Sequence, residues 1–151
     1  MKLIIKTVLQ VQIPIETVFT AIVNPKEMTQ YFISKSSGVM EEGAEIIWEW
    51  PEFPGQKSIV NAIKIEKNRF ISFVWDHSTT VEITLEEQTD QSVIVRITES
   101  EKELNEENLK WYAGNTEGWA NFLACLKAYL EYGINLRTGS FEFLRTSNQN
   151  G

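Results

Sequence analysis

The residues best suited to acid–base or nucleophilic chemistry stand together at Asp76, His77 and Ser78, which are the three residue types of a hydrolase triad. Neighbouring residues of an extended chain point to opposite sides, so the aspartate and the serine cannot both reach the histidine ring without a folded-back turn. The sequence also lacks the Gly-x-Ser-x-Gly pattern of a nucleophile elbow. We therefore interpret His77, the single histidine, as a turn residue and expect no catalytic group.

Patterns for metal ions and nucleotides are missing from the sequence as well. One histidine and one cysteine cannot build a His/Cys zinc site, and no acidic loop has the spacing of a calcium site. The glycine-rich phosphate-binding motifs do not occur. We expect neither a metal nor a cofactor. Cys125 is interpreted as a small packed side chain, and a reactive thiol is the alternative.

Two polar residues share a strand face with apolar neighbours. Glu99 continues an alternating apolar pattern that begins at Val93, so it should point toward the core, where a buried carboxylate needs a partner. Asn61 has the same parity as Ile59 and Ile63 and raises the same question. For each residue two interpretations stay open, namely a polar group in a ligand cavity and a sheet-end residue that reaches solvent.

Aromatic side chains gather on the predicted strands and on the helix expected to face them. Ligand pockets are mostly apolar and contain a few polar groups that orient the ligand. Ordinary core packing is the alternative interpretation of these rings. The candidate ligand-binding residues are Trp48, Trp50, Asn61, Phe73, Trp75, Glu99, Trp119 and Phe122.

A long helix is expected to carry the last two of these aromatic residues. It should run from about Asn115 to Tyr132, with Asn115 or Thr116 capping its first turn and Gly133 ending it in the left-handed conformation. Its apolar residues recur at the spacing of one helical face. They are Trp119, Phe122, Leu123, Leu126 and Leu130.

Alternating patterns upstream predict the sheet on which this helix packs. A first strand starts at Leu3, and two short helices follow, from Pro14 to Asn24 and from Lys26 to Phe32. Further strands are expected at residues 46–50, 57–66, 70–75, 79–87 and 92–100, and short turns make neighbours antiparallel. Residues 101–111 should hold a loop and a short helix. The predicted fold is α+β, with a curved antiparallel sheet of about six strands around the long C-terminal helix.

Composition bounds the class of protein. A chain of 151 residues suggests one domain, which we place at residues 1–145, with a disordered tail at 146–151. The net charge of −7 disfavours nucleic acid and anionic membranes as partners. The acidic excess lies wholly in residues 76–151, which contain 13 acidic and 6 basic residues. We interpret it as a solvated face, and a docking surface for a basic partner is the alternative.

The location and assembly of the protein are also expectations from composition. No run of 18 apolar residues and no secretion signal are visible, and the single cysteine fits a reducing compartment. We therefore expect a cytoplasmic protein without membrane insertion. An uncovered edge strand could pair two copies, so the expected state is a monomer or a weak dimer.

Several local motifs, spread over about residues 5–132, carry a resemblance to a known family. The most specific is Gly118-Trp119 in the last helix, followed by leucines at helical spacing. The others are Ile13–Phe19, the Met40–Gly43 turn that leads to Trp48-Glu49-Trp50-Pro51, the strand Phe73–Trp75 and the run Leu126–Glu131. In these motifs the chain resembles the START-like, or helix-grip, superfamily and, within it, homologues of the activator of heat-shock chaperone ATPases (the Aha type).

The resemblance implies a cavity between sheet and helix, which in various relatives holds lipids, hormones or other apolar molecules. Some relatives bind a chaperone and some cyclise polyketides, and no catalytic motif is shared across the superfamily. Where relatives often have Gly-Phe after the last strand, this chain has an acidic segment from Glu99 to Leu104. The loop that borders the cavity mouth is therefore expected to differ.

Three functions follow as hypotheses. The first is a non-enzymatic domain that binds an apolar or amphipathic small molecule in the cavity between sheet and helix. The second is a co-chaperone module that binds a heat-shock chaperone ATPase. The third, an enzyme of the cyclase or hydrolase type, has no catalytic constellation to support it.

Overall fold

The computed structural model describes residues 1–76 and 78–145. The turn predicted at His77 and the tail predicted at 146–151 lie outside the described residues. Within them, the elements in chain order are β1 (Lys2–Val11), α1 (Ile15–Val23), α2 (Pro25–Met28), β2 (Lys35–Ser36), β3 (Ile46–Trp50), β4 (Phe53–Glu66), β5 (Phe70–Trp75), β6 (Thr79–Glu87), β7 (Val93–Glu103) and α3 (Glu106–Tyr132).

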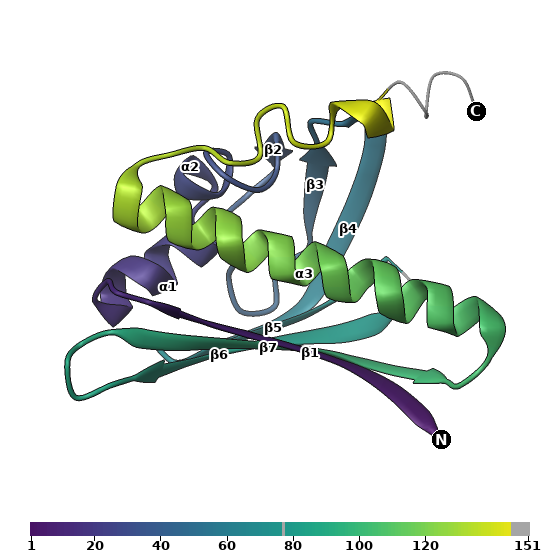
Figure 1. The fold of residues 1–151 in the computed structure, drawn as a ribbon, viewed down its shortest axis with the longest axis horizontal. Helices are drawn as coiled ribbons and strands as arrows, with labels where there is room; N and C mark the ends of the chain where they lie inside the picture. The colour runs from purple at the N-terminus through teal and green to yellow at the C-terminus, as the bar shows by residue number, and fades with distance from the viewer. Residues whose placement is uncertain (77, 146–151) are drawn as a thin grey trace.

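Seven strands of the described ranges form one antiparallel sheet in the order β1-β7-β6-β5-β4-β3-β2. Figure 1 shows α3 lying across the sheet, with β1, β6 and β7 beneath it and β3 and β4 rising on its far side. This arrangement confirms the α+β fold with a curved sheet around a long helix. The seventh strand, β2, pairs with β3 and was missed because the segment from Ser34 to Gly38 has the composition of a turn.

Strand β4 contains a bulge that changes which of its residues face the core. Asn61 pairs with Val74, whereas Lys64 pairs with Ser72, so β4 holds one extra residue between the two pairs. Ala62 sits there with a φ of 50°. The simple alternation predicted for this strand is therefore wrong. Before the bulge the buried positions are Ser58 and Val60, not Ile59, which is 52% exposed.

Helix α3 begins earlier than its apolar stripe predicts. Its N-cap is Asn105, whose side chain accepts a hydrogen bond from the backbone N–H of Asn108 at 2.8 Å, so the cap predicted at Asn115 or Thr116 is wrong. The loop and short helix predicted at 101–111 are replaced by the end of β7 and the first turns of α3. These turns are mostly exposed and carry no apolar stripe. The helix ends at Gly133 with a φ of 66°, as predicted.

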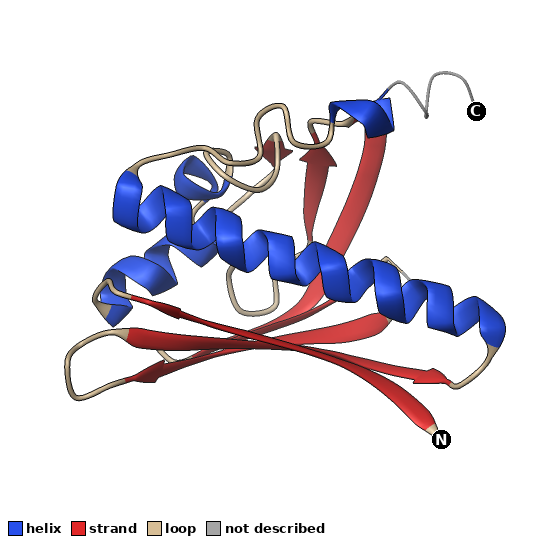
Figure 2. Ribbon diagram, in the orientation of Figure 1, coloured by secondary structure: helices blue, strands red, loops and turns tan. Residues whose placement is uncertain are grey.

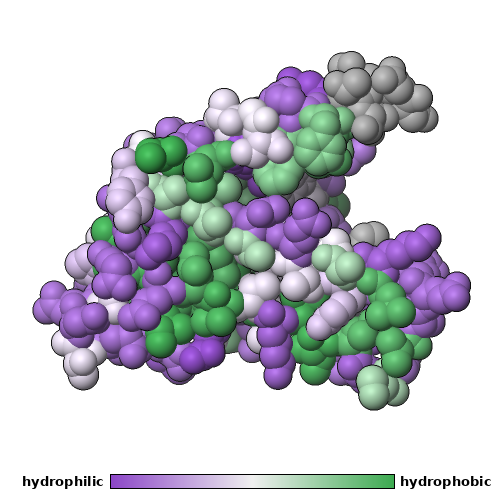
Figure 3. Space-filling view, in the orientation of Figure 1, coloured by the Kyte–Doolittle hydropathy of each residue, from purple (hydrophilic) through white to green (hydrophobic). Residues whose placement is uncertain are grey.

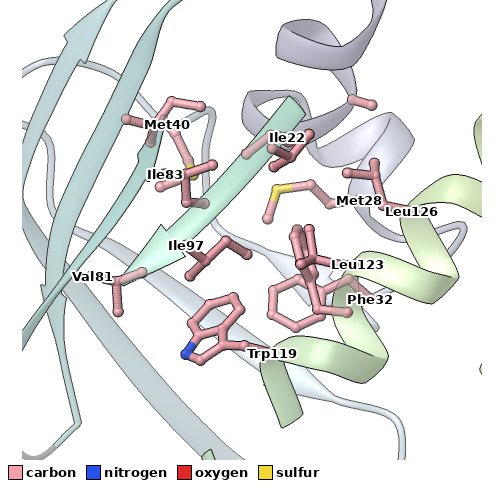
Figure 4. Packing of buried hydrophobic residues seen from close by; sticks show 14 of the residues in the cluster. Ile22, Met28, Phe32, Met40, Val81, Ile83, Ile97, Trp119, Leu123 and Leu126 are labelled. Atoms are coloured by element: carbon pink, nitrogen blue, oxygen red, sulfur yellow. The ribbon is translucent and has the colours of Figure 1, made fainter. Parts of the chain in front are cut away.

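The core lies between the sheet and the second half of α3. In Figure 4, Trp119, Leu123 and Leu126 of α3 face side chains of β6 and β7, and Ile22 and Met28 fill the space beside them. Trp119, Phe122, Leu123 and Leu126 are all buried, as predicted, and Leu130 packs at the edge of the cluster. Burial of four such side chains contributes roughly 10 kcal/mol gross at about 1.5–3 kcal/mol each.

The segment after α3, residues 134–145, is called here the C-terminal strap. It runs back above α3 to the ends of β3 and β4 and finishes in a helical turn at 142–145 (Figures 1 and 2). Two arginines fasten it. Arg137 pairs with Glu52, and an Nη of Arg145 donates to the backbone carbonyl of Pro51 at 2.8 Å. No helix in the described ranges is both long and apolar enough to cross a membrane.

Candidate functional site

A pocket of about 590 Å³ opens where the sheet, α3 and the strap meet. In the space-filling view the surface is hollowed on the right, between the N-terminal half of α3 and the upper part formed by the strap and the ends of β3 and β4 (Figure 3). The residues that line the pocket are Phe32, Trp50, Phe53, Gln56, Lys57, Ser58, Trp75, Asp76, Asn115, Gly118, Trp119 and Arg137.

The candidate residues from the sequence fall into three groups. Trp50, Trp75 and Trp119 line the pocket. Four more candidates are buried behind this lining. They are Trp48, Phe73, Glu99 and Phe122. Asn61 lies apart from the pocket, opposite Val74 in the β4–β5 pair, because the bulge breaks the alternation on which its expected position depended.

Glu99 fixes two of the lining tryptophans from behind. Its side chain is fully buried, which confirms the orientation that the alternation of β7 predicts. One carboxylate oxygen accepts from Trp119 Nε1 at 2.8 Å and from Asn115 Nδ2 at 3.1 Å. The other accepts from Thr79 Oγ1 at 2.5 Å and from Trp75 Nε1 at 3.0 Å. Four neutral donors thus satisfy both oxygens, so Glu99 holds the wall and presents no free oxygen to a ligand.

Aromatic contacts join the lining into one wall. Ring centroids are 5.3 Å apart for Trp75 and Trp119, 6.2 Å for Trp50 and Trp75, and 5.1 Å for Phe32 and Trp50. The Nε1 of Trp50 donates to Ser58 Oγ at 2.9 Å. The indole N–H groups of all three lining tryptophans are therefore used inside the protein, so these residues offer mainly ring carbon to a ligand.

Arg137 closes the pocket from the strap. Its Nη and Nε donate to the two carboxylate oxygens of Glu52 at 2.5 and 3.3 Å, and both side chains are largely buried. The guanidinium carbon lies 5.8 Å from the ring centroid of Trp50, 6.0 Å from that of Phe32 and 5.1 Å from that of Phe141. A planar cation packed against three rings and paired with a carboxylate has little freedom to move.

A second hollow, of about 380 Å³, also borders Arg137. Gly118 and Arg137 line both hollows, whereas Gly114, one helical turn earlier, lines the second alone. A Cβ atom added to either glycine would meet no atom within 4 Å. These two positions in α3 therefore border open space.

Several lining residues were missed at the sequence level. Arg137 and Glu52 are 85 residues apart, and the segments around both have the composition of turns. Phe53 and Gln56 lie in the stretch that Pro51, Pro54 and Gly55 mark as a turn, although β4 begins at Phe53. The available signal was Phe141, an aromatic residue beyond the predicted helix end, whose ring centroid lies 5.1 Å from the guanidinium carbon of Arg137.

Two kinds of reactive group, a metal cluster and an activated thiol, can be checked among the described residues. These residues contain no group of three His, Cys, Asp or Glu side chains placed to hold a metal ion. Cys125 is buried, and this burial raises the pKa of its thiol, which favours packing over reactivity. At the pocket wall, Trp50 binds Ser58, while Trp75, Asn115 and Trp119 bind the buried Glu99 and Arg137 binds Glu52.

The fold and the pocket define a helix-grip protein, in which an antiparallel sheet curves around a long C-terminal helix and leaves a hollow beside it. Residues 12–131 match the family described as activator of Hsp90 ATPase homolog 1-like proteins. The chain therefore belongs to this family, as the motifs of the sequence predict. Among proteins with curated descriptions, no sequence matches the chain significantly.

Solved structures with the same fold come from several bacteria. A protein of Staphylococcus saprophyticus is 35% identical, with 91% of this chain and 96% of that chain covered and a TM-score of 0.76. The Aha1 dimer of Colwellia psychrerythraea is 21% identical, with coverages of 86% and 97% and a TM-score of 0.74. A protein of Bacillus halodurans is 20% identical, with coverages of 85% and 96% and a TM-score of 0.73.

Proposed function

We propose that this chain binds an apolar or amphipathic small molecule in the pocket between the sheet, α3 and the strap. The observation that carries the proposal is a hollow of about 590 Å³ with five aromatic side chains in its lining, two of them fixed by the buried Glu99. Small-molecule sites in proteins have this size and this mostly apolar character.

The same geometry favours a binding role over catalysis. The buried carboxylate of Glu99 already accepts four hydrogen bonds, so it has no free lone pair directed at a reacting group. Arg137 is held by Glu52 in a comparable way. A fixed, aromatic wall suits the recognition of a ligand's shape, and we propose a non-enzymatic protein located in the cytoplasm.

Filling the pocket at Gly118 tests this proposal. In Gly118→Leu the new side chain projects from α3 into open space, and leucine is a better helix former than glycine by up to about 1 kcal/mol. The matched control is Gly114→Leu, which makes the same change one turn earlier and reaches only the second hollow. Both variants should fold with unchanged or higher thermal stability.

The measurement is a thermal-shift screen against fatty acids, sterols and polycyclic aromatic compounds, with native mass spectrometry of each hit. A ligand at a hundredfold excess over its dissociation constant stabilises the folded state by about 2.7 kcal/mol, a shift of several degrees. We expect one chemical class to stabilise the wild type and Gly114→Leu but not Gly118→Leu. A ligand that stabilises all three proteins equally would contradict binding in this pocket.

A second candidate function is the regulation of a heat-shock chaperone ATPase. The description of the family supports it, and so does an exposed acidic corner where β7 passes into α3. This corner contains Glu101, Glu103, Glu106 and Glu107. A basic partner surface would complement it.

The test is the ATPase rate of the cognate chaperone with and without this protein at low salt. Glu101→Lys should weaken a genuine effect, whereas Glu45→Lys, an exposed acidic residue before β3, should leave it intact. An unchanged rate without any detectable complex would exclude this role.

A further inference from the structure

The charged groups of the pocket are unevenly distributed. The carboxylate of Glu99 contacts Trp75 and Trp119 from behind, and Asp76 follows Trp75 at the rim. The basic residues of the lining lie elsewhere, with Arg137 on the strap against Phe32 and Trp50, and Lys57 on β4. Arg137 and Lys57 thus stand against Asp76 alone in the lining of a pocket in a chain of net charge −7, and Glu52 pairs with Arg137 from outside this lining.

Arg137 keeps hydrogen-bonding capacity after it has been fixed in place. A guanidinium carries five N–H donors, and the pair with Glu52 uses Nε and one Nη atom. The remaining donors belong to a group that is held against three rings and lines the pocket. Such a preorganised guanidinium binds an anionic group at little entropic cost.

We infer that the pocket selects an aromatic anion, whose acidic group binds Arg137 and whose rings lie toward Trp75 and Trp119. The inference rests on the proposed small-molecule function and names the ligand class. This orientation places the ligand's negative charge beside the basic residues and away from Glu99. The selecting residue belongs to the strap, which lies beyond the family match at residues 12–131.

Two fluorescent probes that differ by one anionic group test the inference. They are 8-anilinonaphthalene-1-sulfonate and N-phenyl-1-naphthylamine, which share a ring system and brighten when they leave water. The wild type should bind the sulfonate at least about tenfold more tightly than the neutral probe, because a hydrogen bond to a charged group adds about that much affinity.

The decisive variant is Arg137→Met with Glu52→Gln, which removes both charges together and leaves no buried charge unpaired. The methionine keeps an apolar stem against Phe32 and Trp50. We expect the ratio of the two affinities to fall to about one, so that the preference for the sulfonate disappears. The matched control is Arg96→Met with Glu86→Gln, the same change at an exposed ion pair, which should keep the preference.

A single variant provides an independent measurement if the double variant does not fold. Glu52→Gln keeps Arg137 and removes the carboxylate that competes with the ligand, so the sulfonate should bind more tightly and the neutral probe should bind as before. A sulfonate affinity that does not rise would contradict the inference.

The outcomes separate this inference from the proposed function. If the neutral probe binds, and Gly118→Leu abolishes its binding, but the sulfonate has no advantage that depends on Arg137, the ligand class is wrong and the pocket remains a binding site. If neither probe binds, or Gly118→Leu affects neither, the proposed function fails and the inference fails with it.

Discussion

Glu99 connects more of this molecule than any other single side chain described above. From β7 its carboxylate reaches Trp75 on β5, Thr79 at the start of β6, and Asn115 and Trp119 on α3. The donors are neutral, so the cost of burying the carboxylate is offset by four hydrogen bonds and not by a countercharge. The position of the pocket wall therefore depends on a residue that the pocket does not expose.

Replacement of this carboxylate is expected to be costly. In Glu99→Gln the amide nitrogen must face two of the four donors, and at least one indole N–H loses its acceptor, so the free energy of unfolding should fall by about 1–3 kcal/mol. Urea denaturation measures this change, and a red-shifted tryptophan emission would report the released rings. Glu82→Gln, at an exposed position on β6, should change stability by less than about 0.5 kcal/mol. Equal effects of the two substitutions would contradict the role of Glu99.

The candidate site was only partly predictable at the residue scale. Local alternation placed Glu99 in the interior, and helical spacing placed Trp119 on the buried face of α3. No local pattern could pair Arg137 with Glu52, because only the path of the strap brings these residues together. The parity of Asn61 misled for a related reason, since one extra residue between Asn61 and Lys64 puts Asn61 and Ile63 on opposite faces of β4.

Among the helices and strands, the main irregularity is the extra residue in the bulge of β4. Ala62 has a φ of 50°, in the left-handed region, which residues with a Cβ atom adopt at a cost of about 1 kcal/mol. Its side chain is exposed, so packing does not compensate for the strain. The bulge bends β4 between its pairing with β5 and its pairing with β3, where the strand rises beside α3.

At the bulge, a residue that usually favours strands should lower the stability of the protein. Valine favours strands, yet Ala62→Val should lower the free energy of unfolding by about 1 kcal/mol, because a β-branched side chain tolerates the left-handed region least. Ala62→Gly should leave stability unchanged or raise it. The comparison variant is Lys64→Val, an exposed position past the bulge, where a neutral or stabilising effect is expected. Urea midpoints measure all three variants, and a stabilising Ala62→Val would overturn the argument.

Most elements could be predicted from the sequence because their patterns are local. Alternating apolar residues indicate the buried face of β6 and of β7, and the apolar stripe indicates the buried face of α3. The first turns of α3 could not be found in this way, because they extend past the core and carry no apolar face. The start of β4 was hidden by Pro54 and Gly55, which are compatible with the end of a strand but typical of turns.

At the scale of the whole molecule, tyrosines link α3 to the short helices. Tyr129 of α3 donates its hydroxyl to the carboxylate of Glu27 on α2, and its ring stacks on Tyr31 with centroids 5.5 Å apart. The hydrogen bond to Glu27, with burial, raises the pKa of Tyr129 to about 12. Burial likewise raises the pKa of Tyr31, whose hydroxyl donates to the carbonyl of Ala21 at 2.8 Å.

These shifts predict a loss of stability in alkali. An unfolded tyrosine ionises near pH 10, whereas Tyr129 keeps its proton in the folded state up to about pH 12, so the stabilisation is complete below pH 10 and is lost as the pH rises toward 12. Urea denaturation at a series of pH values measures the slope. Tyr129→Phe should be less stable at neutral pH and should lose less stability above pH 10. Identical slopes for the two proteins would contradict the contribution of Tyr129.

The place of β1 at the edge of the sheet also determines the order in which the molecule can assemble. Lys2 of β1 pairs with Glu103 of β7, about 100 residues later in the chain. The first strand therefore cannot pair until the last strand is present. Loop closure over such a distance is slow, and folds dominated by distant pairings take milliseconds to seconds to form. During synthesis the N-terminal strand therefore stays unpaired until nearly the whole domain has left the ribosome, and chaperone protection of the nascent chain matters most in that interval.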